Sequence, residues 1–212
     1  MTVRRLLLVL VVTTVCVSGA GFAATLGVAS GHLWAGSQML TKGTCTVTAA
    51  TDTYADEHTN GNNSASTTLA VQPDNAKRQW AFISFDLSSC NVPTSGGADS
   101  ATLKLYEATA PHTGQALTLT PVSSSWPTNL PFATAQALTY GTATAGVATG
   151  TTNGVLLNIT VTADVDTFIK NPTTTFGWRI SNNGAQTAQD QVVLSSAEAA
   201  ANRPQLVISY EK

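Results

Sequence analysis

Arg78 to Leu87, with the sequence RQWAFISFDL, form the clearest β-strand pattern in this chain. One face of such a strand is entirely apolar and carries Ala81, Ile83, Phe85 and Leu87. The other face begins with Trp80 and Phe82 and continues with Ser84 and Asp86. Because side chains alternate between the two faces of a strand, this pattern predicts a central strand that is covered on both sides in its first half.

Other short extended segments are spaced about ten residues apart and are separated by turn residues, as at 60–64 and 73–75. We expect strands at Cys45–Ala49, Asp52–Ala55, Thr68–Val71, Ala101–Glu107, Leu117–Val122, Val155–Val161, Phe176–Ser181, Gln191–Ser195 and Pro204–Tyr210. The segment 123–154 lacks periodicity and is interpreted as a long excursion over the domain, with an edge strand near Leu138–Tyr140.

The period changes only at residues 162–170, where Val165, Phe168 and Ile169 have helical spacing. Thr162 is placed to cap this segment, and acidic residues stand in its first turn. We therefore predict one short helix at about 162–170 in an otherwise all-β fold. Regular short strands without internal repeats are typical of a jelly-roll β-sandwich.

The N-terminal segment has the order of features found in secretory signals. Arg4 and Arg5 precede an apolar run from Leu6 to Val17, and small residues follow. These small and apolar residues continue to Ala35, which is long enough to span a bilayer at about 20 residues. We expect residues 1–35 to be a signal peptide or an uncleaved membrane anchor, residues 36–44 a short linker, and residues 45–212 the sandwich domain.

The charge of the exported part argues against nucleic acid as a partner. Arg4 and Arg5 leave with the leader, so the 10 basic residues of the chain fall to eight against 12 acidic ones, a net charge of −4. No basic stripe remains that could follow a phosphate backbone. A membrane partner is expected only through the N-terminal segment, if it stays uncleaved.

Cys45 and Cys90 remain after the leader. In an oxidising compartment an even pair is interpreted as one disulfide, which would close a loop of about 45 residues and contribute on the order of 4 kcal/mol. Two free thiols are the alternative. A zinc site is disfavoured because two cysteines without a nearby histidine do not complete a tetrahedral ligand set.

Several segments together resemble the DNRLRE-type domains, which include modules classed with carbohydrate-binding module family 96. The matching segments are Asp52–Tyr54, Phe85–Leu87, Ala101–Tyr106, Ser125–Trp126, Val161–Val165, Gly177–Ile180, Ser195–Glu198 and Asn202–Tyr210. The resemblance implies a jelly-roll sandwich outside the cell, with uronate-rich polysaccharide as the ligand of some members. The chain has Thr160 where members often have Asp, and this departure weakens the transfer of ligand specificity more than that of the fold.

Trp80, Lys77 and Arg78 form the candidate carbohydrate site. An aromatic face can stack on a pyranose ring while cations meet uronate carboxylates. The alternative is that the 123–154 excursion covers Trp80, and we expect this burial. Asp52 and Asp56, near a loop rich in Asn, are candidate ligands of a structural calcium ion, with solvated surface acids as the alternative.

No catalytic motif accompanies these residues, and no other cofactor is expected. The leading hypothesis is a secreted or surface-associated, non-catalytic module that binds carbohydrate, in particular acidic polysaccharide, or another component of the cell envelope. One alternative is a structural, appendage-like surface protein that binds no sugar. A more remote alternative is a polysaccharide lyase or hydrolase, whose two carboxylates could not be picked out of 12 acids.

Overall fold

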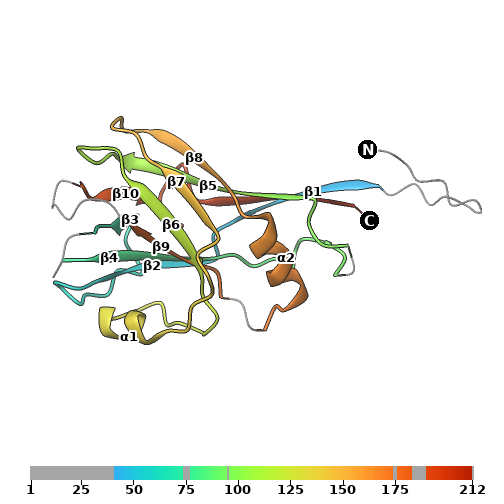
Figure 1. The fold of residues 1–212 in the computed structure, drawn as a ribbon, viewed down its shortest axis with the longest axis horizontal. Coiled ribbons are helices and arrows are strands. Elements are labelled where there is room, and N and C mark those ends of the chain that lie inside the picture. Colours follow the sequence, from blue (N-terminus) through green and yellow to red (C-terminus); the bar gives the residue numbers. More distant parts are fainter. Residues whose placement is uncertain (1–40, 74–76, 95, 174–175, 183–189, 212) are drawn as a thin grey trace, which may run out of the picture. The chain divides into compact units, whose positions relative to one another are not determined.

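The computed structural model describes residues 41–73, 77–94, 96–173, 176–182 and 190–211. Within them, two antiparallel sheets pack face to face as a β-sandwich (Figure 1). Sheet A has six strands, in the order β1 (Lys42–Thr48), β11 (Gln205–Glu211), β5 (Ser100–Thr109), β10 (Val192–Ser195) and β3 (Thr68–Val71), with β8 (Val155–Thr160) also paired to β5. Sheet B has five, in the order β2 (Thr51–Asp56), β4 (Gln79–Ser84), β9 (Trp178–Asn182), β6 (Ala116–Pro121) and β7 (Ala145–Ala148). The expected all-β sandwich is confirmed.

β4 is an inner strand of sheet B and is covered on both faces, as its sequence predicts. Ala81 and Ile83 face the core between the sheets, whereas Phe82 faces a second apolar cluster on the outside of sheet B. The strand ends at Ser84, earlier than the predicted Leu87. Gly177, at φ +86°, lies so close to this point that a Cβ on it would be 2.0 Å from the carbonyl oxygen of Ile83. Only glycine fits there.

The second helix, α2 (Thr162–Lys170), has the bounds that the helical spacing predicts. Val165 and Phe168 are buried against the core between the sheets. The predicted cap is wrong, because Val161 occupies the N-cap position without a capping side chain and Thr162 is the first helical residue. The Thr162 hydroxyl oxygen instead accepts a hydrogen bond of 2.9 Å from the backbone N–H of Ala101, which joins the start of α2 to β5.

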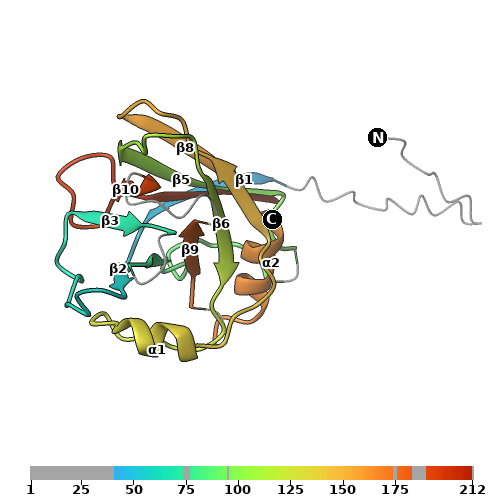
Figure 2. The ribbon, with the colours of Figure 1, turned by 60° about the vertical axis from the view of Figure 1, so that its left-hand side comes forward.

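The expectation of a single helix is wrong, because the excursion contains α1 (Phe132–Ala137). This helix lies beside sheet B (Figure 2), and its residues Phe132 and Ala135 are buried in the outer cluster. The predicted edge strand near Leu138–Tyr140 is reduced to one bridge between Val122 and Tyr140. A helix of six residues is too short to show a helical period, which is why the sequence did not reveal it.

Cys45 and Cys90 form the predicted disulfide, with their Cα atoms 5.6 Å apart. The bond joins β1, at the edge of sheet A, to the loop that follows β4 in the chain. β1 begins at Lys42, inside the stretch 36–44 that was expected to be a linker. The predicted leader, residues 1–35, lies outside the described residues. Neither helix in the described part of the chain has the length and apolarity that a membrane span requires.

Candidate functional site

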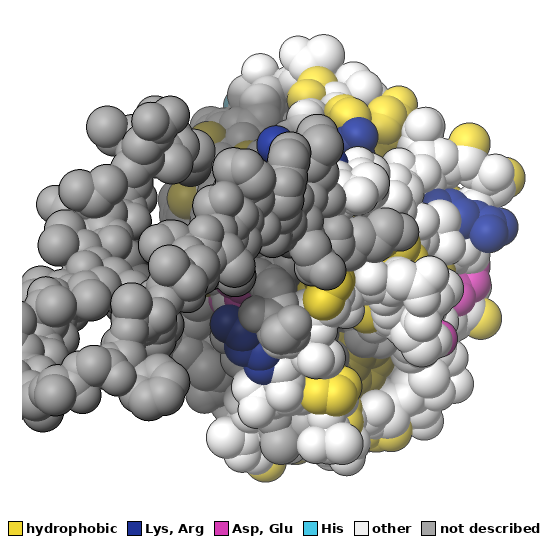
Figure 3. Space-filling model, turned by 90° about the vertical axis from the view of Figure 1, so that its right-hand side faces the viewer, with side chains coloured by type: hydrophobic (Ala, Val, Ile, Leu, Met, Phe, Trp, Pro, Cys, Tyr) yellow, Lys and Arg dark blue, Asp and Glu magenta, His cyan; other side chains and the backbone are white. Residues whose placement is uncertain are grey.

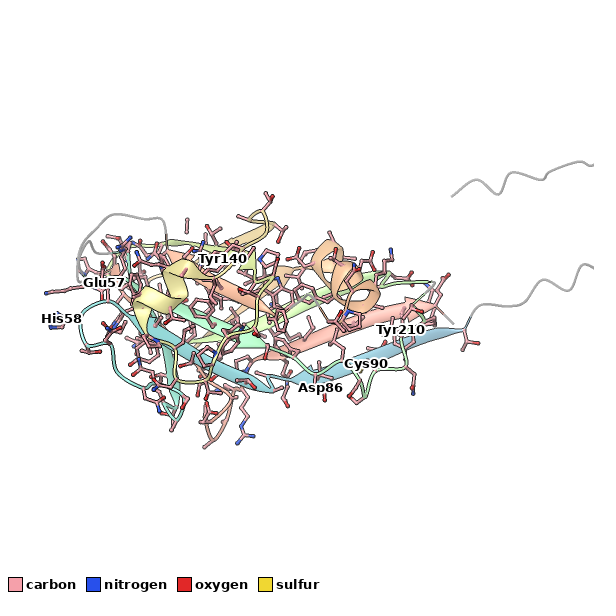
Figure 4. The ribbon with its side chains drawn as sticks, turned by 90° about the horizontal axis from the view of Figure 1, so that it is seen from below. Glu57, His58, Asp86, Cys90, Tyr140 and Tyr210 are labelled. Atoms are coloured by element: carbon pink, nitrogen blue, oxygen red, sulfur yellow. A yellow bond between two sulfur atoms is a disulfide. The ribbon has the colours of Figure 1, made fainter. Side chains whose placement is uncertain are left out.

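The outer face of sheet B carries a group of aromatic and cationic side chains around Trp80. Strand alternation places Trp80 on this face of β4, and Arg179 of β9 lies on the same face because it pairs with Phe82 in the register. Tyr140 reaches the group from the segment after α1, beside that helix in Figure 4. We call Arg78, Trp80, Tyr140 and Arg179 the outer-face cluster.

Arg179 is held by two aromatic rings. Its Cζ atom lies 4.6 Å from the centroid of the Trp80 ring and 4.2 Å from that of Tyr140. Both distances are within the range of cation–π contacts. The Nη2 atom donates a long hydrogen bond of 3.4 Å to the Thr120 hydroxyl, and the buried Nε–H has no acceptor. Arg179 forms no ion pair with a carboxylate among the described residues.

Arg78, by contrast, is neutralised by Glu57. Its Nε and Nη2 atoms donate hydrogen bonds of 2.9 Å and 2.7 Å to the two carboxylate oxygens of Glu57, a bidentate pair. The Arg78 guanidinium accordingly holds the pKa of Glu57 below its usual value. Arg78 also lies 5.2 Å from the Phe132 ring centroid and 5.9 Å from that of Trp80. The positive charge of Arg78, which the sequence analysis placed in the candidate carbohydrate site, is therefore already compensated by Glu57.

Trp80 is half-buried rather than fully exposed or fully buried. The Phe132 ring of α1 packs against it at a centroid distance of 4.7 Å, so the excursion does cover part of the indole. With Arg179 and Phe132 both in contact with this ring, Trp80 is not an open stacking platform. Lys77 is exposed at the entry to β4. Within the described residues the cations over Trp80 are Arg78 and Arg179.

Sequence reasoning missed two members of this cluster. Arg179 follows Trp178 in the predicted strand Phe176–Ser181, and alternation along a strand places neighbouring residues on opposite faces. That signal was therefore present in the sequence. Tyr140 follows the unpredicted helix α1, in a segment without periodicity, so no local signal connects it with Trp80.

Asp52 and Asp56 are not brought together as calcium ligands. Both lie on the same face of β2 but four residues apart, about 13 Å along a strand. Asp56 accepts hydrogen bonds from the backbone N–H groups of His58 and Thr59 and from the Gln79 side chain. Within the described residues no three His, Cys, Asp or Glu side chains are grouped to hold a metal ion.

Asp52 instead interacts with Glu198. Burial, the neighbouring Glu198 charge and a hydrogen bond to Glu198 raise the pKa of Asp52 to about 7, although a backbone hydrogen bond from Ala197 opposes this.

A pocket of about 350 Å³ opens between α2, the start of β9 and the loop after β4. Its walls are largely apolar and include Phe85, Leu87, Phe168 and Trp178. Asp86 also lines it, but this exposed carboxylate accepts the backbone N–H of Ser88 in its own turn. The pocket contains no acid–base pair, and so it adds no catalytic site.

The described residues form a two-sheet antiparallel sandwich with a cation held between aromatic rings, an architecture that fits the class of β-sandwich binding modules. Residues 43–210 match carbohydrate-binding module family 96, and the chain belongs to that family. The resemblance stated from the sequence is thereby confirmed. Membership implies a non-catalytic module with a carbohydrate ligand. No curated protein matches the chain.

Proposed function

We propose that this chain is an exported, non-catalytic module that binds acidic polysaccharide through the outer-face cluster. The observation that carries the proposal is the Arg179 guanidinium, which is fixed between Trp80 and Tyr140 and has no carboxylate partner among the described residues. A fixed guanidinium presents a planar fork of donors that matches a carboxylate. Uronate residues supply such carboxylates along a polysaccharide.

In this proposal Trp80 and Tyr140 position the cation, and the sugar carboxylate meets Arg179. Lys77, exposed at the entry to β4, contributes a second positive charge near the cluster, while Arg78 remains paired with Glu57. The rings also lower the entropy lost on binding, because the guanidinium is already ordered before the ligand arrives. The cluster thus favours acidic over neutral sugars.

The overall charge supports a local site rather than a general attraction to polyanions. The chain carries 10 basic and 12 acidic residues, and Lys and Arg side chains are scattered among uncharged ones on the face in Figure 3. Binding should therefore depend on individual cations. Export is supported by the Cys45–Cys90 disulfide, since such bonds persist in oxidising compartments.

The proposal is tested by affinity electrophoresis of residues 41–212 in gels that contain polygalacturonate, alginate or neutral xylan. We expect retardation by the uronate polymers and none by xylan. Arg179→Gln should weaken binding by at least about tenfold, because a charge-assisted hydrogen bond contributes about 1.5–3 kcal/mol. Arg179→Lys, which keeps the charge but loses the planar fork, should fall between the two.

Lys170→Gln is the matched control, because it removes one exposed positive charge at the end of α2, away from the cluster. Its affinity should equal that of the wild type. Failure of every uronate polymer to retard the folded wild-type protein would overturn the proposal. Equal losses in Arg179→Gln and Lys170→Gln would remove the outer-face cluster from the binding site.

A further inference from the structure

Polar side chains form a buried layer inside the sandwich. The strand ends that carry them lie on the left in Figure 1, away from α2. Each of five strands contributes one buried polar residue, which lies near the end of the strand or just outside it. Most other buried positions of these strands are apolar. The polar layer consists of Glu107 (β5), Gln115 (before β6), Thr149 (after β7), Asn182 (β9) and Asp190 (before β10). All five are at most 7% exposed, so their polar atoms need partners within the protein.

Hydrogen bonds connect the layer across both sheets. The Gln115 side-chain amide donates to Asp190 Oδ1 at 2.9 Å, and the Thr113 hydroxyl donates to the same oxygen at 2.7 Å. The backbone N–H of Gln115 donates to the Thr149 hydroxyl at 2.9 Å. Asn182 Nδ2 donates to the backbone carbonyl of Asp190 at 3.1 Å. The N–H and O–H groups named here thus all have hydrogen-bond acceptors.

The surplus in this layer is of oxygen atoms. Glu107 is 0% exposed, and neither of its carboxylate oxygens accepts a hydrogen bond. Gln115 Oε1 is also buried without a partner. The Gly150 backbone N–H lies near enough to oppose the rise in the Glu107 pKa, but it does not reach hydrogen-bond geometry. No Lys, Arg or His pairs with Glu107 among the described residues.

Two of these groups are brought together by the chain between them. Gly150 follows Thr149, and the backbone of Thr149 pairs with that of Gln115 through an N–H···O bond of 2.8 Å. Glu107 beside Gly150 is therefore also near Gln115, whose amide already touches Asp190. The side chains of Glu107, Gln115 and Asp190 therefore lie at the same end of the core.

A buried carboxylate without donors is costly unless something positive neutralises it. A proton on Glu107 would remove the charge, but it supplies a single donor for the three buried oxygen atoms of Glu107 and Gln115 that lack a partner. A hard divalent cation takes up all of these oxygens at once, because Ca²⁺ prefers carboxylate and amide oxygens in flexible sets of six to eight ligands. Water would complete the set.

We propose that the polar layer is a calcium site, with the carboxylates of Glu107 and Asp190 and the Oε1 atom of Gln115 as protein ligands. The site differs from the pair Asp52 and Asp56 suggested by the sequence. It is also separate from the outer-face cluster, so it stands independently of polysaccharide binding. Bound calcium would join sheet A, through Glu107 and Asp190, to sheet B, through Gln115.

The test is thermal unfolding of EDTA-treated residues 41–212 with and without 1 mM CaCl2, together with the calcium content of the dialysed protein. We expect one calcium ion per chain and a rise in Tm of roughly 5 °C. MgCl2 at the same concentration should give a smaller shift, because Mg²⁺ requires a tighter octahedral ligand set.

Glu107→Gln should abolish the calcium-dependent shift, while its EDTA-treated form should melt above the EDTA-treated wild type because a buried charge has been removed. Asp190→Asn should weaken calcium binding at least tenfold and serves as the second variant if Glu107→Gln does not fold. Asp52→Asn, which changes a buried carboxyl outside the layer, should keep the full shift. No bound calcium and an unchanged wild-type Tm would overturn the proposal, as would a full shift in Glu107→Gln.

Discussion

Trp178 and Trp80 lie on neighbouring strands of sheet B but on opposite faces, and their surroundings differ completely. Trp178 faces the core and is 0% exposed, with the Phe168 and Phe85 rings at centroid distances of 4.7 Å and 6.1 Å. Its indole N–H donates to Asp164 at 2.7 Å. Trp80 faces outward and is flanked by guanidinium groups.

The difference shows that the groups packed against each face of sheet B, and not the residue type, determine the role of each tryptophan. The inner ring meets apolar groups and one hydrogen-bond acceptor, so it contributes to stability. The outer ring is covered only in part by α1 and orders a cation instead. The inner face of sheet B thus contributes to stability, whereas its outer face carries a partly covered tryptophan that contacts a cation.

The largest expected effect distinguishes these two faces directly. Trp178→Ala should lower the free energy of unfolding by about 3–5 kcal/mol, because it empties a fully buried site. Trp80→Ala should lower it by about half as much, since its ring is already partly in contact with water. Urea denaturation of both variants measures the difference. Equal losses would mean that the outer face is as closed as the inner one.

Removal of the disulfide tests how firmly the inner core is held. The double variant Cys45→Ser/Cys90→Ser should lose about 4 kcal/mol by the loop-entropy relation for 45 residues. Denaturation of the wild type with and without reductant provides the control and should give the same difference. Polysaccharide binding by the folded variant should be unchanged, because the outer-face cluster contains neither cysteine. Unaltered stability would show that strand pairing alone holds β1.

Asp52 makes the inner face sensitive to pH. Its pKa is raised from 3.8 to about 7 by folding, so the folded state binds the proton more tightly than the unfolded state. The free energy of unfolding should therefore fall as the pH rises from about 4 to 7, by on the order of 2–4 kcal/mol in total. In Asp52→Asn this part of the pH dependence should vanish. A wild type and an Asp52→Asn variant with parallel pH profiles would refute the assignment.

The smallest effect concerns the outer face. The Tyr140 hydroxyl donates to the backbone carbonyl of Ala135 in α1, and Tyr140→Phe removes this hydrogen bond while it keeps the ring. We expect a loss of about 1 kcal/mol in the free energy of unfolding. The ring that supports Arg179 remains, so polysaccharide affinity should stay within twofold of the wild type. A tenfold loss of affinity would show that the hydroxyl itself contacts the ligand.

The features that the sequence predicted are those with local or compositional causes. β4 shows its alternation within ten residues, and α2 shows its spacing within nine. The pairing of Cys45 with Cys90 was predicted from the expected oxidising compartment and the even count of cysteines after the expected leader. Each of these signals can be found without knowledge of which strands are neighbours.

The remaining features depend on which segments meet in space. Arg78 is the nearest cation to Trp80 in sequence, but the β2–β4 pairing brings Glu57 to it and neutralises it. Arg179 reaches Trp80 only because β9 pairs with β4. Glu107 is the last inward-facing residue of β5, after three apolar ones, and its isolation inside the core becomes visible only when both sheets are assembled.

The antiparallel pairing of β1 with β11 has a mechanical consequence. Lys42 pairs with Glu211, so both outer ends of these strands lie together at one end of sheet A. A pulling force applied at those two ends would separate the residue pairs of the ladder one after another. Only a small force would be needed to separate each pair. Cys45 pairs with Ile208, and its bond to Cys90 stops β1 from being peeled away beyond that point. In a module that links a chain to a polymer under tension, only the first few residues of β1 would therefore detach from β11. The disulfide would then resist further detachment of β1.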